Sequence, residues 1–270
     1  PAKIDQLLAR EGMLNCNPAS TPAIPEHHVK PDDESQQIDE IRSLVGSGIH
    51  ISRTCRPDLS QATNALARVA SDPRQVHVGP KQRYLRYLKG TRDLGITMRR
   101  TESKQNPIQV FADSDYAGDE CDRKSTSGII IQLYGFPVIW SSKKQSCVAL
   151  SSSEAEYIAM CEAGRSAIWL FRLLKELELP CLTDKTLLPI PIHEDNKSTI
   201  SLTRTPAVQG RTKHVEVRYH WIRNKVQEGF IKPCWLTSAR QLADVLSKPT
   251  KVSTFTGLMN IGFMGMFDFD

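Results

Sequence analysis

The stretch 107–142 reads P-I-Q-V-F-A-D-S-D-Y-A-G-D-E-C-D-R-K-S-T-S-G-I-I-I-Q-L-Y-G-F-P-V-I-W-S-S. It contains three short apolar runs, P-I-Q-V-F-A, S-G-I-I-I-Q-L-Y and P-V-I-W-S-S, which have the length and residue types of strands. A turn at Gly135 joins the second run to the third and predicts a hairpin. We therefore expect three neighbouring strands, with Asp113 where the first one ends.

Helices and strands alternate after this stretch. That order predicts an α/β fold, a mixed sheet of about five strands with flanking helices. The further elements expected are a helix over 152–179, a strand in L-P-I-P-I-H-E, helices near 196–204 and 213–228, a strand in F-I-K-P-C-W-L and a helix at 239–247.

The pattern before residue 93 differs from the pattern after it. Apolar residues recur at helical spacing in 38–92, whereas 15–37 is rich in Pro, Asn, Ser and acids and offers little that can pack. The apolar, glycine-rich end of the chain is expected to pack loosely or to pair with sequence outside this chain. We divide the chain into a loop or linker (1–37), a helical segment (38–92), the α/β domain (93–248) and a C-terminal tail (249–270).

Composition narrows the class of protein. The chain is 40% hydrophobic and 24% charged, as a globular protein is, and no apolar run approaches the roughly 18 residues of a membrane span. Its net charge is +5, with basic clusters at 81–100 and 203–225 that suit a polyanionic partner or are solvated helix faces. Seven cysteines without a C-x-x-C pair predict a reducing compartment. Because Pro1 stands first, we expect a piece of a longer polypeptide.

Four acidic residues stand at strand ends or on helices. They are Asp113 in V-F-A-D-S-D-Y, Glu156 in S-S-S-E-A-E-Y-I-A, Asp195 in I-H-E-D-N-K-S and Asp244 in A-R-Q-L-A-D-V-L-S-K-P. Converging carboxylates are the ligands that Mg²⁺ takes from proteins, and they repel one another without a cation. The four acids therefore predict a site for two Mg²⁺ ions, with Mn²⁺ as a substitute, that could hydrolyse a phosphodiester.

Each motif leaves a choice of acid. Asp113 is preferred to Asp115 because it ends the apolar run. Glu156 is preferred to Glu154 because apolar residues follow it, and the two lie on different sides of a helix. Glu194 neighbours Asp195, but D-N-K fits a strand-ending motif better. The alternative for Asp244 is an ordinary acid on a helix surface.

The flanking motifs resemble one known family. R-K-S-T-S-G, S-S-K-K-Q, S-S-S-E-A-E-Y-I-A, E-D-N-K-S-T-I, R-T-K-H-V-E-V-R-Y-H-W-I-R and L-A-D-V-L-S-K-P are similar to the ribonuclease H domain that ends copia-type retrotransposon polyproteins. T-C-R-P-D-L-S-Q-A and R-Y-L-K-G-T extend the resemblance into the helical segment. G-S-G-I-H-I-S departs from it, because the family has an apolar, Tyr-containing helix there.

The resemblance implies a metal-dependent endonuclease that hydrolyses the RNA strand of RNA–DNA hybrids. It identifies 1–37 as a remnant of the reverse transcriptase, 38–92 as its connection segment and the missing upstream domains as partners. The polymerase motif Y-x-D-D is absent from this chain, so polymerisation by this chain alone is not expected. The implied location is the cytoplasm, in a retrotransposon particle, or the nucleus, with no membrane association.

Two segments offer substrate contacts. Hydroxyls and basic groups in R-K-S-T-S-G could hold a phosphate or a ribose 2′-hydroxyl, although an ordinary turn explains them equally well. The histidine of T-K-H-V-E could shuttle protons, contact phosphate or be structural. The candidate residues are Arg123, Lys124, Ser125, Thr126, Arg211, Lys213 and His214.

Two other functions compete with an active ribonuclease H. The chain could be an inactive retrotransposon-derived fragment that only binds nucleic acid. It could also be an integrase, which has the same fold and three acids. The D-N-K motif, the fourth acid and the lack of a His/Cys zinc module argue against the integrase.

Overall fold

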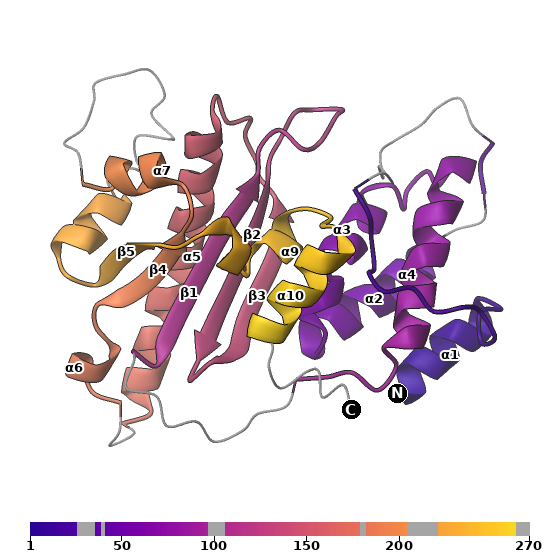
Figure 1. Cartoon of the computed structure of the whole chain (residues 1–270), viewed down its shortest axis with the longest axis horizontal. Helices are drawn as coiled ribbons and strands as arrows, with labels where there is room; N and C mark the ends of the chain where they lie inside the picture. The colour runs from indigo at the N-terminus through magenta and orange to yellow at the C-terminus, as the bar shows by residue number, and fades with distance from the viewer. Residues whose placement is uncertain (26–35, 39–40, 97–105, 179–181, 205–220, 263–270) are drawn as a thin grey trace.

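The computed structural model describes residues 1–25, 36–38, 41–96, 106–178, 182–204 and 221–262. Five strands form one mixed sheet in the order β3-β2-β1-β4-β5 (Figure 1). This arrangement confirms the α/β class and the sheet of about five strands. The strands are β1 (Ile108–Asp115), β2 (Thr126–Leu133), β3 (Phe136–Lys144), β4 (Ile190–Glu194) and β5 (Ile231–Trp235).

The strand directions bring the ends of β1 and β4 together. Strands β1, β2 and β3 are antiparallel neighbours, and the β2–β3 turn has positive φ at Tyr134 (53°) and Gly135 (85°). Two positive φ values define the type I′ turn that suits a tight hairpin. Strand β4 pairs parallel to β1, with Val110 opposite Ile192, and β5 pairs parallel to β4. The carboxyl ends of β1 and β4 therefore lie at one edge of the sheet.

Helix α5 (Ser152–Glu176) covers one face of the sheet (Figure 1). Its N-terminus is capped by Ser151, whose side chain accepts a hydrogen bond from the backbone N–H of Glu154. Alternate residues of β1 and β4 are fully buried and join α5 in one apolar core, as the period of a strand requires. This packing fixes the start of α5 beside the ends of β1 and β4.

The helical segment packs against the other end of the sheet, beside β3 (Figure 1). It contains α2 (Arg42–Thr54), α3 (Ser60–Arg68) and α4 (Val78–Gly90), with short 3₁₀ turns between them. G-S-G-I-H-I-S lies inside α2, where a Cβ at Gly48 would come within 2.7 Å of the Tyr84 hydroxyl. The glycine thus makes room for a buried tyrosine from α4. The described residues confirm the helical character expected of 38–92.

Both ends of the chain differ from the expected loop and loose tail. Helix α1 (Ala2–Arg10) buries its apolar face, including Leu7 and Leu8, against the helical segment. Helix α10 (Val252–Gly262) buries Phe255 in the same core, where its ring meets Tyr87 edge-on at 5.9 Å. The physical reason is apolar residues at helical spacing in both segments, which gain free energy from burial.

The remaining helices are short. Residues 221–227 are helical, and positions 213–220 of the helix expected over 213–228 lie outside the described residues. The helix expected at 239–247 is divided into a 3₁₀ turn (Ser238–Arg240) and α9 (Asp244–Ser247). Helices α6 (Asp184–Leu187) and α7 (Lys197–Leu202) flank β4. Within the described residues, no helix is both long and apolar enough to span a membrane.

Candidate active site

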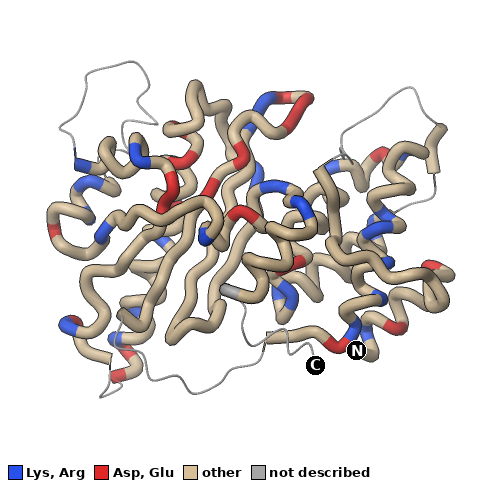
Figure 2. Tube along the Cα trace, viewed as in Figure 1, with Lys and Arg blue, Asp and Glu red and all other residues tan. Residues whose placement is uncertain are grey.

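Three of the four acids named from the sequence meet at the edge where β1 and β4 end. One carboxylate oxygen from each of Asp113, Glu156 and Asp195 lies within 4.8 Å of the others. Asp113 comes from β1, Glu156 from the first turns of α5, and Asp195 directly follows β4. Figure 2 shows acidic segments gathered at this end of the sheet. The sheet and α5 therefore form a rigid support for all three carboxylates.

The fourth acid, Asp244, joins this group through α9. The ammonium of Lys248 lies 2.9 Å from Asp244 Oδ1 and 3.5 Å from Asp113 Oδ2. The hydroxyl of Ser247 also donates a hydrogen bond to Asp113 Oδ2. Asp244, Ser247 and Lys248 thus approach Asp113 as one short segment, from the sheet face opposite α5 (Figure 1).

A glycine allows α9 to approach the sheet this closely. Gly128 on β2 lies opposite Asp113 in the strand register. A Cβ at Gly128 would lie 2.4 Å from the carbonyl oxygen of Ala243 and 2.8 Å from the backbone nitrogen of Ser247. A side chain of any size at this position is incompatible with the observed place of α9. The glycine of R-K-S-T-S-G therefore has a structural role in the site.

Burial and mutual repulsion shift the pKa values of the acids. Burial raises the pKa of Glu156 to about 11, with further contributions from Glu194, Asp113 and Asp195. Burial and Asp113 raise the pKa of Asp244 to about 7, although Lys248 opposes that shift. Repulsion of this kind is relieved by a proton or by a cation. The group is therefore a strong attractor of positive charge.

A fifth carboxylate, that of Glu194, lies beside this group, although the D-N-K motif favoured Asp195 over it. Glu194 is fully buried, and burial followed by the charges of Asp113 and Asp195 raises its pKa well above the usual range. Its Oε1 accepts a hydrogen bond from the backbone N–H of Asn196 at 3.2 Å. The alternation of I-P-I-H-E could have found it, because Glu194 shares the buried face of Ile190 and Ile192.

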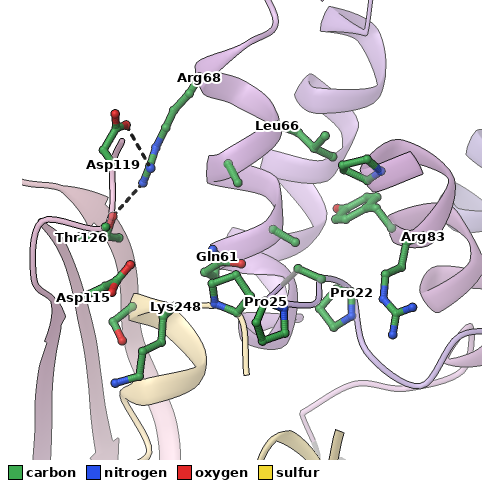
Figure 3. A pocket seen from close by; sticks show the side chains of 18 of the residues that line it. Pro22, Pro25, Gln61, Leu66, Arg68, Arg83, Asp115, Asp119, Thr126 and Lys248 are labelled. Atoms are coloured by element: carbon green, nitrogen blue, oxygen red, sulfur yellow. Dashed lines mark hydrogen bonds and ion pairs between the residues drawn. The ribbon is translucent and has the colours of Figure 1, made fainter. Parts of the chain in front are cut away.

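The other two alternative acids lie elsewhere. Glu154 lies in the first turn of α5, and its Oε2 accepts a hydrogen bond from the backbone N–H of Leu150 at 2.8 Å. Asp115 lines a pocket beside the helical segment together with Lys248 and Arg68 (Figure 3). Neither belongs to the group of oxygens within 4.8 Å of one another. The geometry therefore favours Asp113 and Glu156 as members of the acidic group.

The hydroxyls proposed as substrate contacts have partners inside the protein. Ser125 is fully buried, and its Oγ accepts a hydrogen bond from the backbone N–H of Ala117 at 3.0 Å. Thr126 is also buried, and its Oγ1 accepts from Arg68 Nη2 at 2.9 Å (Figure 3). These contacts favour the ordinary structural turn over a substrate site. Arg123 and Lys124 keep partial exposure on the loop before β2.

Two members of the basic cluster at 81–100 have partners inside the protein. Lys81 pairs with Glu11 at 2.9 Å, and Arg92 pairs with Asp5 at 2.9 Å. These pairs hold the N-terminal segment against the helical segment, and a contact of the cluster with a polyanion stays a prediction. Arg211, Lys213 and His214, with most of the 203–225 cluster, lie outside the described residues.

An exposed tryptophan borders the acids on their other side. Trp235 ends β5, is 51% exposed, and donates a hydrogen bond from Nε1 to the main-chain oxygen of Asp195 at 3.2 Å. The ammonium of Lys197 lies 4.8 Å from the centre of its ring. Trp235 stands at the open end of β5, which is an edge strand, so its ring is not part of the core.

The acidic group has the donor set that a divalent cation of the Mg²⁺ class requires. Its ligands are hard carboxylate oxygens from at least three side chains. The Oε2 atoms of Glu156 and Glu194 are buried and have no hydrogen-bond partner. Buried polar atoms are costly when unpaired, so a ligand that satisfies them would be bound favourably. Asp113, Glu156 and Asp195 are the residues best placed to hold such a cation.

The sequence of the chain resembles sequences of known proteins. No family model matches the chain. It is 36% identical over 251 residues to the retrovirus-related Pol polyprotein from transposon RE1 of Arabidopsis thaliana, covering 92% of this chain and 17% of that protein. The corresponding polyprotein from transposon RE2 is 37% identical over 245 residues, covering 90% and 16%. Copia-type retrotransposon Pol polyproteins are homologues of this chain.

The chain spans about a sixth of the length of these two curated relatives. The foamy viral protease–reverse transcriptase solved in complex with an RNA/DNA hybrid matches 78% of the chain and 26% of that protein, with 16% identity and a TM-score of 0.45. The sequence resemblance to copia-type Pol polyproteins is confirmed by the two Arabidopsis relatives.

Proposed function

We propose that this part of a Pol polyprotein is a ribonuclease H, a metal-dependent endonuclease that cuts the RNA strand of an RNA–DNA hybrid. The observation that carries the proposal is the convergence of Asp113, Glu156 and Asp195, with Asp244 joined to Asp113 through Lys248. Homology to Pol polyproteins supports the choice of nucleic acid as substrate. The acidic residues themselves would repel a phosphate, so a cation is needed to bring substrate and acids together.

The proposed cofactor is a pair of Mg²⁺ ions, which Mn²⁺ could replace. When bound, they would supply an activated water and stabilise the oxygen that leaves phosphorus. Asp113 is the acid best placed to bind both ions. Its carboxylate lies near that of Asp195 and also pairs with Lys248, which in turn pairs with Asp244. Ser247 holds the Asp113 carboxylate in place, and Ser238 does so for Asp195 through a 2.6 Å hydrogen bond.

The substrate would lie along the edge of the sheet that carries the acids. Trp235 and Lys197 are placed to contact the substrate on one side of the acids. A base can stack on the exposed tryptophan ring, and the lysine ammonium attracts a phosphate. Arg123 and Lys124 remain proposed contacts on the loop before β2. The 2′-hydroxyls of an A-form strand would mark it as RNA.

A labelled hybrid tests this function directly. The purified chain should cut the RNA strand of an RNA–DNA hybrid in Mg²⁺ and should stop when a chelator is added. Duplex DNA of the same sequence should remain intact. Cleavage that persists in the chelator, or no cleavage of any hybrid in Mg²⁺ or Mn²⁺, would refute the proposal.

The second candidate function is that of a fragment that binds nucleic acid without cutting it. It is favoured only by the short span of the chain relative to its relatives, since a complete substrate platform would then include domains that are outside this chain. Salt-sensitive hybrid binding without cleavage, in the presence of bound Mn²⁺, would select it.

A further inference from the structure

The acidic group already contains a cation of its own. The Lys248 ammonium lies between Asp244 Oδ1, at 2.9 Å, and Asp113 Oδ2, at 3.5 Å. Asp113 is also a member of the three-carboxylate group on the other side, with Glu156 and Asp195. The acids therefore form two sets that share Asp113. The first set also contains Glu156 and Asp195, and the second contains Asp244 and is bridged by the Lys248 ammonium.

We propose that the Lys248 ammonium stands in the position of the second divalent cation, so that this cation binds only after the lysine has moved away. The inference rests on the proposed function, because it concerns the cations of that site. A first cation would enter among Asp113, Glu156 and Asp195 without meeting the lysine. A second one, between Asp113 and Asp244, would have to replace it.

Distance and charge make the two occupants mutually exclusive. A divalent cation of the Mg²⁺ class sits about 2.0–2.1 Å from its carboxylate oxygens. An ion that contacts the Asp113 and Asp244 oxygens at that distance would lie next to the ammonium that now pairs with both. Like charges this close repel strongly in a partly buried site. One of the two must leave.

The displaced ammonium has a place to go. The Lys248 side chain is 39% exposed and borders a cavity of about 360 Å³ that Asp115 also lines. Figure 3 shows Lys248 at the edge of this cavity, with its ammonium directed away from Pro22, Pro25 and Leu66. Asp115 offers a carboxylate acceptor, since its side chain lines the same cavity as Lys248 (Figure 3). The lysine can therefore move without leaving carboxylates altogether.

Counting bound Mn²⁺ by electron paramagnetic resonance tests the proposal on the whole chain without reference to activity. The unmodified chain should bind a first Mn²⁺ more tightly than a second. Lys248→Met, which keeps the length of the side chain and removes its charge, should tighten the second step by at least about tenfold and the first step by much less. Lys251→Met removes an exposed charge three residues away and should change neither step.

Three results would overturn the proposal. The second step could be unchanged in Lys248→Met, it could become weaker, or both steps could tighten equally, which would show only a general charge effect. If the unmodified chain binds no Mn²⁺ at all, the proposed function fails too. If it binds Mn²⁺ and Lys248→Met binds it identically, this inference alone fails.

A second measurement applies even if Lys248→Met does not fold. The lysines of the unmodified chain can be ¹³C-methylated and followed by NMR during a Mg²⁺ titration, with the Lys248 signal assigned by its loss in Lys248→Arg. The signal should move as the second ion binds and stay in place while the first one binds. A signal that moves with the first ion, or never moves, would contradict the displacement.

Discussion

Gly128→Ala should damage the acidic site without touching any acid. The added Cβ would lie 2.4 Å from the Ala243 carbonyl oxygen, 2.8 Å from the Ser247 nitrogen and 3.1 Å from the Leu246 carbonyl carbon. Ordinary contacts of a Cβ begin near 3.4 Å, so α9 would have to withdraw by about 1 Å. These three atoms belong to the main chain and cannot rotate out of the way.

The expected size of the effect follows from that shift. Overpacking of this kind costs roughly 1–3 kcal/mol of unfolding free energy, which is about 2–12 °C in melting temperature for a domain of this size. A displacement of about 1 Å at a catalytic group can lower the rate by about 10²-fold. Because α9 carries Asp244 and Ser247 and is followed by Lys248, we expect hybrid cleavage to fall by about 10²-fold together with this loss of stability.

Thermal unfolding and cleavage of a labelled hybrid would measure both quantities. Gly46→Ala is the matched control, since its Cβ would meet nothing within 4 Å and it lies inside α2. That change should be neutral or stabilise by up to about 1 kcal/mol. The reasoning is refuted if Gly128→Ala retains the cleavage rate and melting temperature of the unmodified chain.

Three further changes are expected to have measurable effects. Asp58→Ala leaves the fully buried Arg56 without its 2.7 Å partner and should lower the unfolding free energy by roughly 3–5 kcal/mol, measured by urea denaturation. Without divalent cations, stability should fall as pH rises from about 4 through 7 and above. The folded pKa values of Glu156 (about 11) and Asp244 (about 7) exceed their unfolded values, so the folded chain holds the extra protons that a higher pH removes. Trp235→Ala should weaken hybrid binding by roughly 1–3 kcal/mol, measured by fluorescence anisotropy.

Each of these three has a control. Asp72→Ala removes a partly exposed pair with Arg74 and should cost no more than about 1 kcal/mol. Saturating Mg²⁺ should reverse or flatten the pH dependence of the unfolding free energy. If the unfolding free energy falls with pH as much as it does without Mg²⁺, the assignment of Glu156 and Asp244 to the metal site is contradicted. Trp169→Ala removes an exposed ring on α5, away from the acids, and should leave hybrid affinity unchanged.

The sequence predicts the sheet well because its strands are short runs rich in β-branched residues. Asp113 and Asp195 could be recognised because each stands at the end of such a run. The parallel pairing of β1 with β4, which brings Asp113 to Asp195, is seen only in the structure. The roles of Gly128 and Lys248 could not be predicted in this way. Both depend on how closely α9 approaches β2, a contact between segments more than 100 residues apart.

Local pattern also misplaced some functions. Ser125 and Thr126 carry the hydroxyls that a phosphate site needs, but tertiary packing turns them inward to Ala117 and Arg68. The charge of Lys81 suits a polyanion, yet its partner is Glu11. In each case the side-chain chemistry was recognised correctly, while the partner was set by contacts that residue spacing does not encode.

The central claim is that the converging carboxylates hold the cations that cut a hybrid. Asp195→Asn tests it most directly, because asparagine keeps the shape of the side chain and can still accept the hydrogen bond from Ser238. With Mg²⁺ and a labelled RNA–DNA hybrid, the account predicts that Asp195→Asn binds the hybrid as tightly as the unmodified chain, or more tightly, and does not cut it. Cleavage by Asp195→Asn at the rate of the unmodified chain would contradict the account.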